Sequence, residues 1–379
     1  MNLLKYIEKF GNEDFETRPF NNVDATIMAV ISYLNFDMFD KKDDETYIYF
    51  KDIDPSLFEE LSKDEFIAKE NVKLLTLLKS SPRYRNLGVS FVRRNTCIKK
   101  EEQFFAVTII FPNDDFYIAF RGTDFSVVGW KEDFNMAFHD TIPSQKSALA
   151  YVKEVTSKLK GNFYIGGHSK GGNLAFYAHI FQDKETLARC IHAYSFDGPG
   201  FSELKDKFVD TYDEAHKKMT KIVPQNTLVG IILSNLKDAK IVHSTYVGIF
   251  QHNPYSWQIS EETKDFVYRE KRTKESYINE MTLSMWLDSL SLEDKVFATE
   301  SIFLLMGGTK LHLSEFIKDP GERLKTASDV YRNAATEDRQ RFINIFKQMI
   351  YYHRRARKLF AEKEKQEEEP ELAIAIKGE

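Results

Sequence analysis

The sequence predicts an α/β fold in which a mostly parallel central sheet is flanked by helices and followed by a helical C-terminal region. Three observations lead to this prediction. Short apolar runs with a period of two alternate with amphipathic helical runs over residues 88–243. A glycine-rich turn joins one strand to a helix at residues 166–172. After about Glu261 the pattern becomes helical as far as Phe360.

The N-terminal third mixes helices with an antiparallel pair. Apolar residues at helical spacing predict a helix over 23–34, and residues 71–78 predict another. The acidic segment between them, 37–70, is typical of an irregular or short-helix insertion. Alternating residues then predict strands at 88–94, 103–111 and 115–120, and a Pro-Asn-Asp-Asp turn at 112–115 joins the last two into a hairpin.

The middle of the chain repeats a strand and helix alternation. An amphipathic helix over 144–160, stopped by Gly161, would carry the chain back over the sheet to a strand at 163–165. Further strands are predicted at 190–196, 220–223 and 240–243, with a helix over 202–212. Residues 251–254 are expected to form a loop after the last strand.

We divide the chain into three parts: an α/β domain over 1–260, a helical appendage over 261–360, and a charged tail over 361–379 that we expect to be disordered. Gly307-Gly308 and Pro320-Gly321 break the appendage into several helices. The appendage could be a lid, a dimerisation surface or a partner-docking module.

The bulk composition excludes several classes of protein. With 379 residues, a net charge of −5 and a pI near 6.1, nothing predicts nucleic-acid binding. Cys97 and Cys190 stand far apart without metal-type spacing, so we expect a reducing compartment and no disulfide framework. We expect no cofactor and no metal. No apolar run approaches the ~20 residues of a transmembrane helix, and the first residues lack a signal-peptide pattern. A cytoplasmic location is therefore expected.

Ser169 is the candidate nucleophile. It lies in Gly167-His168-Ser169-Lys170-Gly171, which fits the G-x-S-x-G nucleophile elbow between a strand and a helix. Glycines two residues away on either side let strand and helix approach without a Cβ clash. The helix N-terminus supplies N–H groups and the positive end of a dipole beside the serine.

A serine nucleophile needs an acid and a base, which in this type of fold follow the serine in that order. Asp197 is the best acid candidate because it directly follows a strand in Asp-Gly-Pro-Gly. After the next strand the corresponding residues are Gln225 and Asn226, which carry no charge. Asp238 precedes a strand and so lies at its wrong end.

His252 is the base candidate because it lies in the loop after the last sheet strand. His243, at a strand end, is the alternative. His168 sits inside the elbow, where its side chain is expected to point away from the site in a packing role.

Two backbone N–H groups are expected to form an oxyanion hole. One belongs to Lys170, the residue after the nucleophile, and the other to Thr123, after the strand at 115–120. The Thr123 hydroxyl could add a third donor.

These motifs carry a family resemblance. Phe120-Arg121-Gly122-Thr123, then Trp130 to Asp133, then the elbow with its extra Gly172 resemble class 3 lipases. Residues 15–260 more closely resemble an uncharacterised bacterial, lipase-like α/β-hydrolase family. The further shared motifs are P-F-N-x-x-D at 19–24, G-H-S-K-G-G at 167–172, F-D-G-P-G-F at 196–201 and Q-H-x-P-x-S-W at 251–257.

The resemblance implies the α/β-hydrolase fold and a hydrolase acting on lipid-like esters. Class 3 lipases place the acid one strand later, at Gln225 and Asn226 here, whereas the F-D-G-P-G segment resembles the acid loop of pancreatic-type lipases and favours Asp197. We expect an ester substrate, with an acyltransferase or thioesterase as a related reaction and peripheral membrane contact or a homo-oligomer left open. The rival hypothesis is a non-catalytic binding or scaffold protein of the same fold.

Overall fold

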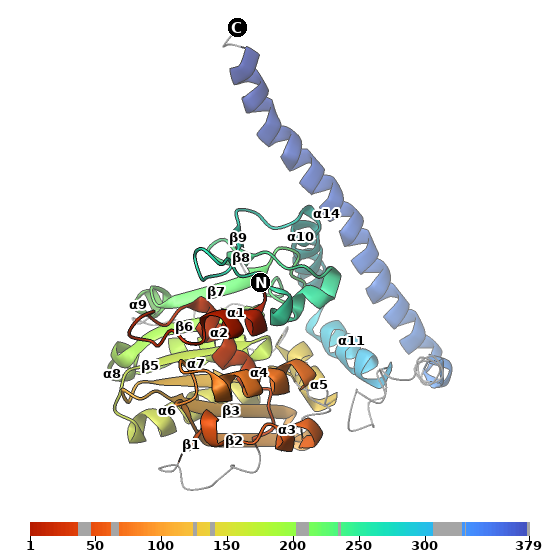
Figure 1. The fold of residues 1–379 in the computed structure, drawn as a ribbon. Coiled ribbons are helices and arrows are strands. Elements are labelled where there is room, and N and C mark those ends of the chain that lie inside the picture. The colour runs from red at the N-terminus through yellow and green to blue at the C-terminus, as the bar shows by residue number, and fades with distance from the viewer. Residues whose placement is uncertain are drawn as a thin grey trace.

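In a computed structural model of the chain, the structure describes residues 1–36, 47–61, 68–123, 127–136, 141–201, 212–233, 236–305, 328–329 and 331–376. A nine-stranded sheet runs through the body of the molecule, with the strands side by side in chain order (Figure 1). The strands are β1 Ile48–Tyr49, β2 Gly88–Cys97, β3 Glu102–Ile110, β4 Phe116–Phe120, β5 Phe163–His168, β6 Cys190–Phe196, β7 Met219–Pro224, β8 Lys240–Val242 and β9 Tyr268–Arg269.

The sheet is parallel in its middle and antiparallel at both sides. Strands β1 to β4 pair antiparallel, β4 to β8 pair parallel, and β9 returns antiparallel to β8. The predicted hairpin is confirmed in β3 and β4, where Ala106 lies opposite Phe120 and Ile110 opposite Phe116. The predicted α/β class, with helices flanking the sheet, is therefore confirmed, whereas only the middle of the sheet, from β4 to β8, is parallel.

Helices connect the parallel strands and cover both faces of the sheet. Helices α5 (Val127–Asn135) and α6 (Pro143–Lys158) link β4 to β5, and α7 (Lys170–Ile180) with α8 (Lys184–Arg189) links β5 to β6. Helices α1 (Leu3–Phe10), α2 (Asn22–Ile31) and α4 (Ala68–Ser80) pack on the face of the sheet opposite to α6 and α7. The remaining short elements of the body are η2 Phe50–Asp52, α3 Ser56–Leu61, η3 Ile98–Lys100, α9 Tyr212–His216, η5 Gly248–His252 and η6 Pro254–Ser256.

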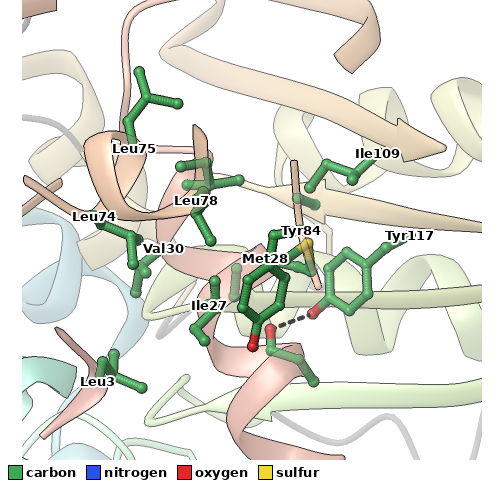
Figure 2. Packing of buried hydrophobic residues seen from close by; sticks show 14 of the residues in the cluster. Leu3, Ile27, Met28, Val30, Leu74, Leu75, Leu78, Tyr84, Ile109 and Tyr117 are labelled. Carbon is green, nitrogen blue, oxygen red and sulfur yellow. Dashed lines mark hydrogen bonds between the residues drawn. The ribbon is translucent and has the colours of Figure 1, made fainter. Parts of the chain in front are cut away.

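Strand alternation divides the core into two clusters, one on each face. On β4, Tyr117 and Ala119 join α1, α2 and α4, whereas Phe116, Ile118 and Phe120 join α6 and α7. Figure 2 shows the first cluster, in which the Tyr117 hydroxyl donates a hydrogen bond of 3.1 Å to the carbonyl of Ala25. The central strands are thus buried on both faces, so they give the loops at their ends a fixed support.

The N-terminal motif at 19–24 has a structural role. Asn21 caps α2, and Asp24 completes the capping box by accepting from the Asn21 N–H at 3.0 Å. The Asp24 carboxylate is fully buried and accepts two hydrogen bonds from Arg83, from Nε at 3.0 Å and from Nη2 at 2.7 Å. This bidentate pair, with the Tyr84 hydroxyl at 2.5 Å, ties α2 to the segment before β2.

The sheet extends past the predicted domain boundary at residue 260. Ile259 and Phe266 form a bridge, and β9 pairs with β8 through Ile241 and Arg269. A two-residue strand is too short to show a period in the sequence, so β9 was not predicted. The predicted helix over 202–212 falls almost wholly outside the described residues, which resume with α9 at Tyr212.

The C-terminal region is helical, with α10 Lys274–Ser289, α11 Leu292–Leu305 and α14 Thr336–Ile376. Helix α14 packs on α10 and α11 and then extends well away from the sheet (Figure 1). The helix continues to Ile376, which differs from the disordered tail expected over 361–379; its Glu, Lys and Ala residues are good helix formers. The predicted breaks at Gly307-Gly308 and Pro320-Gly321 lie outside the described residues.

Candidate active site

Ser169 occupies the sharp turn between β5 and α7. Its backbone has φ 58° and ψ −133°, a strained conformation for a residue with a side chain. A Cβ on Gly167 would lie 2.4 Å from the carbonyl carbon of Gly171, and one on Gly171 would lie 2.2 Å from the Phe120 oxygen. Both flanking glycines are therefore needed for the close approach of strand and helix. Ser169 is half-buried, while its two neighbours in the chain are buried.

Loops from the neighbouring strands β4 and β6 meet at this turn. The Ser169 N–H donates to the carbonyl of Phe196, directly before Asp197, at 2.9 Å. A Cβ on Gly198 would lie 2.7 Å from the Ser169 carbonyl oxygen, and one on Gly122 would lie 3.0 Å from the Ser169 Cβ. The segment after β4 and the segment after β6 thus both abut the candidate nucleophile.

The structure brings Asp197 and His252 together, although 55 positions separate them in the chain. The His252 Nδ1 and the Asp197 Oδ2 lie 2.7 Å apart. The other oxygen, Oδ1, accepts from the Thr227 hydroxyl at 2.5 Å and from the Gly230 N–H at 3.2 Å. Asp197 is fully buried, so these bonds replace the water that a carboxylate requires.

The partner of Nδ1 determines the tautomer of His252. A carboxylate only accepts hydrogen bonds, so Nδ1 carries a proton and donates a hydrogen bond to Asp197. In the neutral ring, Nε2 is then the acceptor, which is the arrangement that a general base requires. The side chain of His252 keeps 15% of its surface exposed, compared with 1% for Asp197.

The Q-H-x-P-x-S-W motif forms the scaffold of the His252 loop. The Trp257 indole N–H donates to the carbonyl of Gln251 at 2.8 Å, and the side-chain oxygen of Gln251 accepts from the Asn226 N–H at 3.1 Å. Trp257 itself is fully buried. The motif residues around His252 therefore hold its backbone from both sides.

The alternative residues have other partners. The His243 Nδ1 accepts from Arg269 on β9, at 3.2 Å from Nε and 3.1 Å from Nη2, and burial together with this cation lowers the pKa of His243. Gln225, at the position where class 3 lipases have their acid, exchanges hydrogen bonds of 2.6 and 2.8 Å with the backbone of Ser244. Asp238 is exposed.

The two residues predicted to form the oxyanion hole are both held by α5. The Thr123 hydroxyl donates to Asp133, so its proton is directed toward that carboxylate. The Lys170 ammonium is buried and donates to Glu132 at 2.9 Å, as well as to the backbone and side-chain oxygens of Gln103 at 2.8 and 2.6 Å. The Lys170 charge is therefore paired inside the protein. Its N–H lies in the first turn of α7, where backbone donors have no acceptor within the helix.

His168 was expected to point away from the site, and the structure instead places it against the loop that carries His252. Its Nδ1 lies 2.9 Å from the Tyr33 hydroxyl, and its Nε2 lies 2.8 Å from the carbonyl oxygen of His252. The two imidazole rings are 4.4 Å apart between centroids. Burial, and then the neighbouring His252, hold the pKa of His168 well below its ordinary value.

Sequence reasoning missed the residues that support Asp197. Thr227 and Gly230 follow β7, and a Cβ on Gly230 would lie 2.5 Å from the Asp197 Oδ1. Lys221 on β7 donates to the carbonyl of Gly230 at 2.9 Å, and burial lowers its pKa to about 7 even though Asp197 favours the charged form. Only the topology indicated that residues after β7 lie near Asp197, because the carboxyl ends of parallel strands share one edge of a sheet.

No helix in the described part of the chain combines the length and apolar character needed to cross a membrane.

Comparison with known proteins places the chain in a family. Neither the curated proteins nor the solved structures contain a match to the chain. A family model described as Mbeg1-like, a domain linked to lipase-like proteins, matches residues 78–304, which include the elbow and both loops around it. The chain therefore belongs to the Mbeg1-like family.

Proposed function

We propose that this protein is a serine hydrolase of the α/β-hydrolase fold that cleaves carboxylic esters. The observation that carries the proposal is the meeting of three loops: a strained serine turn, and beside it an Asp197–His252 hydrogen bond of 2.7 Å. A nucleophile, a base and an acid that orients the base are the parts required for acyl transfer through a serine.

In the proposed mechanism, the His252 Nε2 removes the hydroxyl proton of Ser169 as the serine oxygen attacks the ester carbonyl. The N–H groups of Lys170 and Thr123 donate to the oxyanion of the tetrahedral intermediate. The intermediate collapses to an acyl-serine, and the alcohol leaves with the proton held by His252. Water, activated by the same imidazole, then releases the acid and restores Ser169.

An apolar acyl chain is the proposed substrate feature. The segment directly before His252 exposes four large apolar side chains: Tyr246 at 48%, Val247 at 75%, Ile249 at 50% and Phe250 at 69%. Two of them, Ile249 and Phe250, lie on the same short helix η5 as His252. No acidic residue occurs between Asp238 and Glu261. A non-acidic apolar surface at the base loop favours contact with a hydrocarbon chain.

A fluorophosphonate probe tests the proposal because it reacts with activated serines. We expect labelling of the wild-type protein and none of Ser169→Ala. Ser195→Ala is the matched control, since Ser195 is buried in β6 and its hydroxyl lies close to the same turn. Absence of labelling in the wild type, or equal labelling of Ser169→Ala, would rule out the hydrolase and favour a non-catalytic protein of this fold.

A further inference from the structure

We propose that His168 is a positioning residue for His252. Its Nε2–H holds the backbone carbonyl of His252, in the loop that we call the base loop, and the Tyr33 hydroxyl keeps that proton on Nε2 by donating to Nδ1. The catalytic consequence rests on the proposed function, whereas the positioning itself does not. His168 is fully buried.

The first step concerns the tautomer of His168. A backbone carbonyl only accepts hydrogen bonds, so the contact of 2.8 Å with the His252 oxygen requires a proton on Nε2. Nδ1 is then free of a proton in the neutral ring and accepts from the Tyr33 hydroxyl at 2.9 Å. Tyr33 follows α2 and is buried, so its hydroxyl reaches the elbow from the helix layer over the sheet.

The second step concerns what this bond restrains. His252 is held at its side chain by Asp197 and at its carbonyl by His168. Its ring also lies against the His168 ring, with an interplanar angle of 37°. Two hydrogen bonds and one ring contact thus limit both the backbone and the side-chain orientation of the base. Because His168 directly precedes Ser169, the restraint ties the base loop to the nucleophile turn itself.

The third step concerns charge. In the proposed mechanism His252 becomes an imidazolium, and a second cation packed against it would oppose that charge. Burial holds the pKa of His168 well below its ordinary value, so the ring stays neutral beside the base. A neutral histidine therefore supplies the N–H that the loop requires without adding a positive charge.

Four variants test the proposal in the full chain. His168→Phe keeps a ring and removes both hydrogen bonds, His168→Gln restores an N–H near the Nε2 position, and Tyr33→Phe removes the donor to Nδ1. His179→Phe is the matched control. His179 is also fully buried on the elbow helix, and its Nε2 bonds to a backbone carbonyl, that of Ala215, at 3.1 Å.

With a p-nitrophenyl ester, we expect His168→Phe to lower kcat by about 10- to 100-fold with KM within about twofold, the usual size of a misplaced catalytic group. We expect His168→Gln to recover much of this loss, Tyr33→Phe to fall between, and His179→Phe to stay near the wild type at a similar thermal stability. Unchanged kcat in His168→Phe, or an equal loss in His179→Phe, would overturn the positioning role.

A proton NMR measurement gives a readout independent of hydrolysis. The Nδ1–H of His252, bonded to a buried carboxylate, is expected as a low-field resonance that disappears in His252→Gln. We expect this resonance to shift or broaden in His168→Phe and to remain unchanged in His179→Phe. If the fluorophosphonate probe shows that Ser169 is inert, this resonance still decides the proposal. An unmoved resonance in His168→Phe would contradict it.

Discussion

The α/β body contains ion pairs that are fully buried, whereas the described residues of the C-terminal helices contain none. In the body, the Asp24–Arg83 and Glu132–Lys170 pairs have no exposed side-chain surface. In the helical region the pair Lys274–Glu364 joins α10 to α14 with side chains 48% and 42% exposed. Among the described residues of that region, one small buried apolar cluster consists of Leu290, Ala298 and Ile345.

The difference indicates where this protein requires a single geometry. A buried charge needs its partner in one position, because nothing else replaces its hydration. An exposed pair tolerates movement, since water serves both ends. The Glu132–Lys170 pair joins α5 to the residue that follows Ser169, and α5 also holds Thr123 through Asp133. We therefore expect perturbations of this part of the body to affect chemistry and those of the helices to affect it little.

The largest expected effect is that of Asp197→Asn on activity. The amide can hold the wrong tautomer of His252, so we expect kcat to fall by about 10³- to 10⁴-fold. The measurement is steady-state ester hydrolysis together with the rate of fluorophosphonate labelling. Glu364→Gln, a carboxylate-to-amide change in α14, should leave both rates unchanged. A loss smaller than about tenfold in Asp197→Asn would contradict its role as the acid.

Next in size is the effect of Glu132→Gln on stability. This change leaves the Lys170 ammonium buried without its counter-charge, so we expect a loss of about 3–5 kcal/mol in the free energy of unfolding. Breaking the exposed Lys274–Glu364 pair through Glu364→Gln should cost less than about 1 kcal/mol. Urea titration of both variants measures the contrast. Equal losses would show that the two regions do not differ as described.

Acid should destabilise the body through its buried histidines. Burial lowers the pKa of His179 from 6.5 to about 4, so the folded protein binds a proton less readily than the unfolded chain. Its contribution to stability is therefore complete above pH 6.5 and is lost as the pH falls toward 4. Between pH 7 and pH 5 the loss is about 2 kcal/mol. Thermal unfolding at both pH values measures it, and His179→Phe should reduce the difference; an unchanged difference would contradict the assignment.

The smallest expected effect is that of Val247→Ser on substrate chain length. Removing an exposed apolar side chain beside the base loop should weaken binding of a long acyl chain by about 1 kcal/mol, or roughly fivefold in KM. The acetate ester should be unaffected. Leu292→Ser on α11 removes a side chain of similar exposure, 63%, and should change neither substrate. The measurement is a series of p-nitrophenyl esters; equal changes for acetate and long chains would remove this surface from substrate binding.

Much of the fold was predictable because its signals are local. The hairpin of β3 and β4 follows from alternation and a turn, and the elbow follows from glycines around Ser169. Strand β9 was not predictable, because two residues carry no period and their pairing with β8 is a tertiary contact. The helix through Ile376 likewise differs from a prediction based on charge composition alone.

The candidate site likewise combines residues that the sequence predicts with roles that it does not. The order of Ser169, Asp197 and His252 could be read from motifs and strand ends, because topology sends the ends of parallel strands to one edge. The roles of Lys170 and His168 could not. The Lys170 side chain pairs inside the protein with Glu132, and His168 turns toward the base loop.

The sequence by itself therefore determined the α/β class, the strained serine turn and the candidate residues, since each depends on residues close together in the chain. Only the tertiary structure decided which side chains meet. Asp197 reaches His252 across 55 positions, and Tyr33 reaches His168 across 135. Such contacts depend on how the strands and helices pack, and a hydrogen bond between buried groups forms only when that packing brings donor and acceptor within about 3 Å.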